Sequence, residues 1–210
     1  MPLIELVLAQ NADTLARCLR VREAVFTIEK GVPKEIEVDA LDCLNGACEH
    51  FLIRCDEKDA GALRCTYTPE NAARIQRFCV LKKYRGHGLG KAALEQIESY
   101  CRSRGCRAVE LDAKLSAAGF YEKCGYKTAS DTFIEVGIAH VKMRKISRSC
   151  KNSPAFPPKN AAQSSASLTQ WRKNIRIENA VGEAKSPPIQ CKRSATKMRM
   201  LGKMIYGIDF

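Results

Sequence analysis

The 210-residue sequence contains no apolar run that approaches the ~20 residues needed to cross a bilayer. Its first residues, MPLIELVLAQNAD, also lack the basic stretch followed by a long apolar one that marks a secretory signal. We therefore expect a cytoplasmic protein that neither spans nor binds a membrane. No internal repeat is present, and the length suits one sizeable domain with an appendage.

The eleven cysteines include no C-x-x-C pair, and no histidine pattern accompanies them that could complete a zinc site. Their number is odd and their spacing is irregular. Several stand where a small buried hydrophobe would fit, such as Cys79 in a predicted strand and Cys101 on a predicted helix. We expect reduced thiols in a hydrophobic core and no metal site.

Acidic residues are scarce in one part of the chain only. Residues 1–147 carry 23 Lys and Arg against 20 Asp and Glu, whereas residues 148–210 carry 12 against 3 and hold most of the formal charge of +12. The second segment is rich in Ser, Pro and Asn and shows neither helical nor strand periodicity. We predict a domain at 1–147 and a disordered basic tail at 148–210. The tail is either a solvated extension, the simpler interpretation, or an arm that docks on nucleic acid or an acidic partner.

Strand and helix patterns alternate along residues 1–147. Predicted strands cover 2–9, 49–55, 60–68, 73–81, 107–113, 132–137 and 138–146, and predicted helices begin near 11–13, at 89 and at 116. An acidic, turn-rich loop with one short helical turn is expected over 30–46. This order predicts an α/β (α+β) fold with a mixed, mostly antiparallel sheet flanked by helices.

The run RGHGLGK at 85–91 places three glycines at alternate positions between a predicted strand and a predicted helix. It is not a dinucleotide fingerprint, because the third glycine of G-x-G-x-x-G would fall on Lys91. It is not a P-loop either, because Ala92 stands where a hydroxyl should bind magnesium. A glycine-rich turn into a helix aims several backbone N–H groups at one point, where the helix dipole adds to them. The run therefore suits a diphosphate bound without magnesium.

The R-x-x-G-x-G pattern at 85–90 resembles the acetyl-coenzyme A signature of the GNAT superfamily of N-acetyltransferases. GFYEKCGYK at 119–127 is similar to the superfamily's later motif, in which a short helix carries a tyrosine near the cofactor sulfur. The resemblance covers about residues 3–146. LRVREAVFTIEKGVPKEIEVDALD, RFCVLKKYRGHGLGK and FIEVGIAHVKM look like the YjcF-like (ElaA-related) branch, although Lys114 replaces its usual glutamine. GCRAVELDA with FYEKCGYK also resembles glucosamine-6-phosphate N-acetyltransferases, which rank second.

The resemblance implies an acetyl-coenzyme-A-dependent N-acetyltransferase that acts on a small-molecule or peptide primary amine by direct attack in a ternary complex. A non-catalytic acetyl-coenzyme A-binding regulator is the alternative from another class, and a homodimer is left open. The implied cofactor-binding residues are Phe78, Cys79 and Val80 for the pantetheine arm and Arg85, Gly86, His87, Gly88, Leu89, Gly90 and Lys91 for the diphosphate.

The same resemblance implies a catalytic role for Tyr121, as the acid that protonates the departing thiolate. Glu135 and His140 are the candidate general bases, with Glu135 preferred, and His50 is a third. Arg77, in line with the strand before the glycine run, either faces an anionic substrate or takes part in an ion pair.

Overall fold

The structure is a computed structural model that describes residues 2–44, 46–135 and 137–147. Its strands are β1 (Ile4–Leu8), β2 (Cys48–Cys55), β3 (Lys58–Tyr67), β4 (Ala72–Val80), β5 (Ala108–Lys114), β6 (Lys127–Thr128), β7 (Phe133–Glu135) and β8 (Ile138–Ile146). Its helices are α1 (Ala12–Arg22), η1 (Glu23–Glu29), α2 (Lys34–Glu37), η2 (Lys82–Tyr84), α3 (Leu89–Ser103), η3 (Leu115–Ala117) and α4 (Ala118–Lys123). The predicted tail lies outside the described residues. Among the described helices, none has the length and apolarity to span a membrane.

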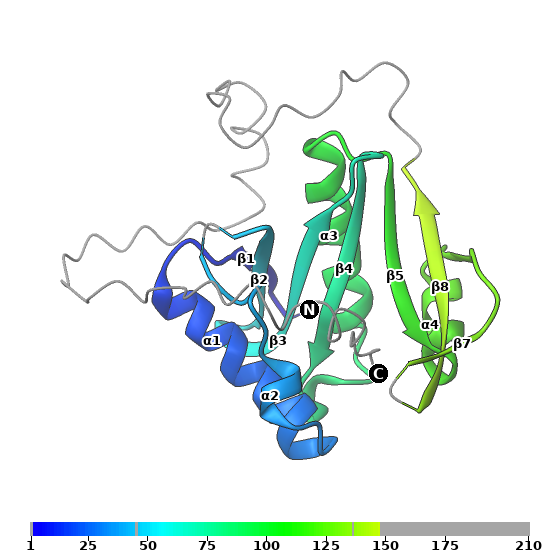
Figure 1. Ribbon diagram of the computed structural model, residues 1–210. Coiled ribbons are helices and arrows are strands. Elements are labelled where there is room, and N and C mark those ends of the chain that lie inside the picture. The colour runs from blue at the N-terminus through cyan, green and yellow to red at the C-terminus, as the bar shows by residue number, and fades with distance from the viewer. Residues whose placement is uncertain (1, 45, 136, 148–210) are drawn as a thin grey trace.

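The strands form one sheet in the order β1-β2-β3-β4-β5-β8-β6, with β7 paired to β8 (Figure 1). Strands β1 to β4 are an antiparallel meander, β4 and β5 are parallel, and β5 and β8 are antiparallel. The predicted fold class and order of elements are therefore confirmed. Strand β6 was not predicted, because two exposed residues give no recognisable period.

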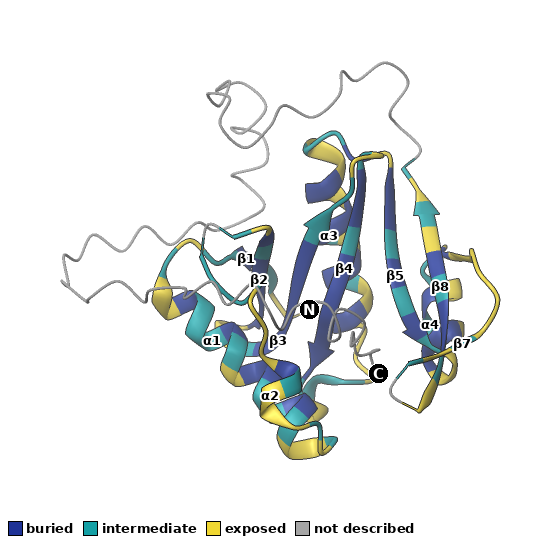
Figure 2. Ribbon diagram, viewed as in Figure 1, coloured by how far each residue is buried: buried dark blue, intermediate teal, exposed yellow. Residues whose placement is uncertain are grey.

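Helices cover both faces of the sheet (Figure 1). On one face, α1 and η1 pack on the meander through Cys18, Val25 and Phe26. On the other face, α3 and α4 enclose the larger cluster, which includes Leu94 and Tyr121. Strands β2 to β4 are consequently buried over most of their length, whereas β8 contains buried, half-buried and exposed residues (Figure 2).

The first helical segment changes its winding part-way. Asn11 caps α1, because its side-chain oxygen accepts a hydrogen bond from the Thr14 N–H at 2.8 Å. From Glu23 to Glu29 the chain continues as a π-helix, a rare form that occurs most often at functional sites. The segment ends at Gly31, which has a φ of 72° and whose N–H donates to the Thr27 carbonyl oxygen at 3.0 Å. Glu29, the last residue of this π-helix, contacts Arg85 at the start of the glycine run, as described below.

The acidic loop folds over a cluster of buried charges. Its predicted helical turn is α2, and the loop supplies Glu37, Asp39 and Asp42. Three fully buried arginines meet these carboxylates: Arg22 from α1, Arg64 from β3 and Arg77 from β4. We call these six residues the charge cluster. Of the two interpretations of Arg77, the structure supports the ion pair.

Asp42 lies at the centre of the charge cluster. Arg22 donates to it at 2.6 and 3.0 Å, and Arg64 donates at 3.1 Å. Burial alone would raise the pKa of this carboxyl group, but the two guanidinium groups lower it to about 2. The carboxyl group of Asp42 is therefore ionised in the folded protein at neutral pH, and folding stabilises this ionised form.

We expect Asp42→Asn to lower the free energy of unfolding at pH 7 by about 3 kcal/mol, because it leaves buried guanidinium groups without their carboxylate. In the parent protein, the pKa depression contributes about 2 kcal/mol above pH 4, and this is lost as pH falls from 4 through 2. Urea unfolding at pH 7, 4 and 2.5 measures both effects. An unchanged acid dependence in the variant would show that Asp42 is not the group responsible.

Candidate functional site

Strands β4 and β5 separate part-way along the sheet. Their register covers three pairs, from Ala72 with Ala108 to Arg74 with Glu110, and ends there. The strands lie together at their amino ends and diverge toward their carboxyl ends (Figure 1). Beyond Arg74, the edge of β4 that faces β5 is thus not covered by that strand. Main-chain groups at such an edge can accept an extended ligand as an added strand.

A β-bulge lies in β4 where the separation begins. Arg77 and Phe78 both lie opposite Leu63 of β3, and the register shifts at this point. Arg77 has a φ of 52°, a left-handed conformation that is uncommon for a residue other than glycine. Bulges of this kind bend a strand and redirect its hydrogen-bonding groups.

The glycine run lies just past the end of β4 and opens α3. Gly86 and Gly88 both have a φ of 78°, and Gly88 is the N-cap of the helix. Within the described part of the chain, none of the backbone N–H groups from 86 to 91 donates a hydrogen bond to another protein group. Several adjacent donors, with the positive end of a 15-residue helix behind them, form a fitting cradle for a diphosphate.

The side chain of Arg85 holds this run against the rest of the fold. Its guanidinium group donates to both carboxylate oxygens of Glu29, at 2.6 and 2.8 Å, and to the carbonyl oxygen of Val80, at 2.8 Å. The hydrogen bond from Arg85 lowers the pKa of Glu29, so this pair is ionised at neutral pH. Arg85 therefore fixes the position of the run, and its contact with a diphosphate stays a prediction.

The residues expected along the pantetheine arm have buried side chains on alternate faces. Phe78 and Val80 belong to the cluster beneath α3, and Cys79 belongs to the cluster beneath α1. Burial raises the pKa of the Cys79 thiol to about 12, so it is protonated and inert at neutral pH. These residues can bind a ligand only through their main chain, as the resemblance implies.

Tyr121 lies on α4 and is completely buried. Its ring packs edge-on against Phe120 at 5.1 Å and against Tyr126 at 5.7 Å between centroids. Burial raises the pKa of its phenol well above the usual value, because the phenolate would be poorly solvated. Tyr121 is therefore held in the protonated form that a hydrogen donor requires.

Of the candidate bases, His140 has the most suitable surroundings. It is buried on β8, and its ring stacks on Phe133 with 6.1 Å between centroids. Its Nδ1 lies 2.9 Å from the carbonyl oxygen of Ile138, which selects the tautomer with a proton on Nδ1. Nε2 then carries the lone pair, and it is buried without a hydrogen-bond partner among the described residues.

Glu135 and His50 occupy different surroundings from His140. Glu135 ends β7 and pairs across the hairpin with Ile138. His50 lies on β2 beside the charge cluster, where its Nε2 is 3.1 Å from the carbonyl oxygen of Leu41. Burial lowers the pKa of His50, and nearby arginines add to that effect. His50 is accordingly part of the packing under the acidic loop.

Residues 24–147 match the sequence profile of the acetyltransferase (GNAT) domain. The chain belongs to the GNAT acetyltransferase family. It is 34% identical over 140 residues to the uncharacterized N-acetyltransferase YjcF of Bacillus subtilis, a match that covers 66% of this chain and 97% of YjcF. The predicted membership of the YjcF-like branch is thereby confirmed.

Solved structures have the same fold. The crystal structure of a candidate N-acetyltransferase from Lactobacillus plantarum superposes with a TM-score of 0.64 and 28% identity, covering 68% of this chain and 97% of that one. Escherichia coli ElaA superposes with a TM-score of 0.60 and 22% identity, covering 69% of this chain and 99% of ElaA. As a member of the GNAT family the protein is an acetyltransferase, and enzymes of this fold use acetyl-coenzyme A as co-substrate.

One further polar group of this GNAT domain, noted in the sequence beside Lys114 but not counted among the predicted site residues, is Asp112. Asp112 lies on β5, two residues beyond the last pair with β4, and its side chain is 5% exposed. Arg74 pairs with one carboxylate oxygen, and the other, Oδ1, is buried without a partner among the described residues. The alternation of Glu110, Asp112 and Lys114 was the available signal, since it places all three on one face of β5.

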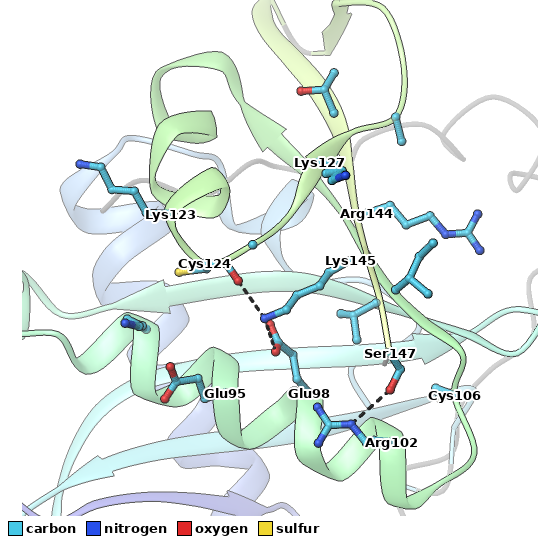
Figure 3. A pocket seen from close by; sticks show the side chains of 16 residues that line it. Glu95, Glu98, Arg102, Cys106, Lys123, Cys124, Lys127, Arg144, Lys145 and Ser147 are labelled. Carbon is cyan, nitrogen blue, oxygen red and sulfur yellow. Dashed lines mark hydrogen bonds and ion pairs between the residues drawn. The ribbon is translucent and has the colours of Figure 1, made fainter. Parts of the chain in front are cut away.

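The GNAT domain also contains a cavity of about 980 Å³ on the α3 side of the sheet. It lies between α3 and the β6–β8 edge, and Lys145 crosses it to bond Glu98 at 2.6 Å and the Cys124 carbonyl oxygen at 2.8 Å (Figure 3). Of the predicted site residues, Lys91 alone is among its lining residues. The cavity therefore touches the glycine run through Lys91 and β5 through Val109, but it includes none of the other predicted site residues. In the described residues, no cluster of three or more His, Cys, Asp or Glu side chains is arranged to hold a metal ion.

Proposed function

We propose that residues 1–147 transfer acetyl from acetyl-coenzyme A to a primary amine by direct attack in a ternary complex. The observation that carries the proposal is the row of backbone N–H groups at 86–91 that lack protein acceptors, next to the uncovered edge of β4. The first N–H groups of an α-helix have no acceptor within the helix and need water or a ligand. In this fold they lie next to the β4 edge that β5 leaves uncovered, so one extended ligand with an anionic end could bind to both.

The fit to a thioester of coenzyme A rests on the shape of the backbone. Gly86 and Gly88 have no atom within 4 Å of the position that a Cβ would occupy, so a diphosphate can approach the main chain closely. The arm of the ligand would follow the β4 edge from Val80 toward Arg77, as an added strand would. When bound, acetyl-coenzyme A supplies the acyl group and a thiolate leaving group.

The residues of the chain then have two proton-transfer roles. Nε2 of His140 takes the proton that the attacking amine loses as the C–N bond forms, directly or through water. The phenol of Tyr121 donates a proton or a hydrogen bond to the sulfur as the C–S bond breaks. The stacked, single-tautomer ring supports His140 in the first role, and Glu135 is the alternative base.

Direct attack needs no cysteine carrier. Burial raises the pKa of Cys79 to about 12 and raises that of Cys124 above its usual value. Neither thiol is therefore a nucleophile at neutral pH. A sequential kinetic pattern with two substrates is the corresponding expectation, in place of a ping-pong pattern.

Release of free thiol from acetyl-coenzyme A tests the proposal with a panel of amines that includes polyamines, amino acids, peptides and glucosamine-6-phosphate. Calorimetry with coenzyme A measures binding separately. Turnover with glucosamine-6-phosphate alone would identify the second candidate activity. Binding without turnover across a broad panel would favour the regulator, and absence of binding would contradict the proposed site.

We expect His140→Gln to lower kcat by about 100-fold, because glutamine preserves a hydrogen bond to Ile138 but cannot accept a proton. Glu135→Gln is the matched control and should change kcat by less than about fivefold. The reverse pattern would move the base to Glu135.

A further inference from the structure

We propose that the charge cluster fixes the β4 bulge, and that Arg77 and Glu37 are positioning residues for acetyl transfer. The inference rests on the proposed function in assigning a catalytic consequence to the bulge. It concerns groups that contact neither the cofactor nor the acceptor, and it gives the acidic loop at 34–42 a role in the reaction. Its basis is a strained residue with buried, well-defined partners.

The strain is at Arg77 itself. A φ of 52° brings Cβ close to the backbone, and a residue with a side chain adopts it when the surroundings require it. Such outliers persist where the structure over-determines them, and they occur most often at functional sites. In this fold, the outlier lies at the first bulged residue of β4, the strand whose uncovered edge is the candidate binding edge for the cofactor.

Four polar contacts of the Arg77 side chain are made with the acidic loop. Its Nε donates to the Glu37 carbonyl oxygen at 3.2 Å and lies 3.6 Å from the Glu37 carboxylate. Its Nη2 donates to the Ile36 carbonyl oxygen at 3.2 Å and lies 3.5 Å from the Asp39 carboxylate. The Arg77 side chain is completely buried, so water cannot replace these contacts.

The partners of Arg77 are in turn held by the other two arginines. Arg22 binds both carboxylate oxygens of Glu37, at 2.7 and 2.9 Å, and its carbonyl oxygen at 2.9 Å. Arg64 binds both carboxylate oxygens of Asp39 at 2.7 Å. Burial and the two neighbouring arginines lower the pKa of Arg77, and Glu37 and Asp39 oppose them. Removing one carboxylate would leave three buried cations with two anions.

The bulge decides which way the following side chains point. Ile75 and Phe78 both face the cluster beneath α3, although they are three residues apart, because the bulge inserts one extra residue. Without it, Phe78 would turn toward α1 and the Arg77 guanidinium toward the apolar cluster beneath α3. The main-chain groups at 78–80, on the part of β4 that β5 does not cover, would turn with them. Holding Arg77 on the α2 side therefore holds this strand edge in its present orientation.

Two substitutions of Arg77 separate the effect of its backbone conformation from the effect of its charge. Arg77→Gly and Arg77→Val both delete the guanidinium, but glycine adopts a positive φ readily, whereas a β-branched residue does so least of all. We expect Arg77→Gly to retain kcat within about tenfold of the parent enzyme and Arg77→Val to lower it by at least about 100-fold. The KM for acetyl-coenzyme A should change less than kcat in both. Glu37→Gln, which weakens the hold on Arg77, should lower kcat about tenfold.

Equal activity of the glycine and valine variants, whether high or low, would overturn the proposal. If Arg77→Val does not fold, Arg77→Ala takes its place, since it differs from glycine by one methyl group and should have a kcat about fivefold lower than Arg77→Gly. Amide hydrogen exchange at Phe78 and Cys79 gives a readout independent of turnover. Faster exchange in the valine or alanine variant than in the glycine variant would support the proposal even if no amine were acetylated, whereas equal exchange would contradict it.

Discussion

Gly88→Glu is expected to abolish acetyl-coenzyme A binding, with a Kd at least about 100-fold higher than that of the parent protein. Gly88 is the N-cap of α3, and its Cβ position opens onto space with no atom within 4 Å. A glutamate there repels a diphosphate. Its own carboxylate can also accept the N–H groups of the first helical turn, which the ligand would otherwise use. Calorimetric titration with coenzyme A measures the loss.

The control for this substitution is at the other end of the same helix. Gly105 has a φ of 83°, compared with 78° at Gly88, and its Cβ position is equally open. Gly105→Glu therefore adds the same charge and a similar backbone strain away from the candidate site, and should leave the Kd within about threefold. Gly88→Ala isolates the strain alone. Retained binding in Gly88→Glu would place the cofactor elsewhere.

Tyr121→Phe is expected to lower kcat by about 100-fold with little change in the Kd for coenzyme A. The hydroxyl is fully buried and held protonated, because burial raises its pKa, and removing it deprives the leaving sulfur of a proton donor. The phenyl ring keeps the edge-on packing with Phe120. A loss in kcat without a loss in affinity is the signature of a group that acts in the transition state.

Tyr126→Phe provides the comparison. Tyr126 is also buried, its ring is 5.7 Å from that of Tyr121, and burial likewise raises the pKa of its phenol. If a buried hydroxyl in this region matters only for packing, the two substitutions should have similar effects on thermal stability and on kcat. We expect the effect on kcat at Tyr121 alone. Unchanged turnover in Tyr121→Phe would remove this residue from the mechanism.

Much of the candidate cofactor site was accessible from the sequence because it is local. The alternating glycines at 86, 88 and 90, between a strand and a helix, specify a turn with positive φ and a helix N-terminus that needs an acceptor. No contact with a distant residue is required for that inference. The role of Arg85 was harder to predict, since its main partner, Glu29, is 56 residues away.

The base and the bulge depended on contacts that a linear pattern does not contain. Sequence analysis preferred Glu135 over His140, and what favours His140 is the stacking on Phe133 and the single hydrogen bond to Ile138. The same analysis left Arg77 between two interpretations. Its left-handed conformation follows from a one-residue mismatch between β3 and β4, which becomes visible only when the strands pair.

The sequence alone determined the family, the order of elements and the glycine turn that opens α3, because periodicity and turn chemistry act within a few residues of the chain. The tertiary structure decided where β4 and β5 part, which carboxylates face the three buried arginines and which histidine is held in one tautomer. Those features arise where segments distant in the sequence compete for the same buried space. Their free energies depend on burial and pairing, which only the folded arrangement defines.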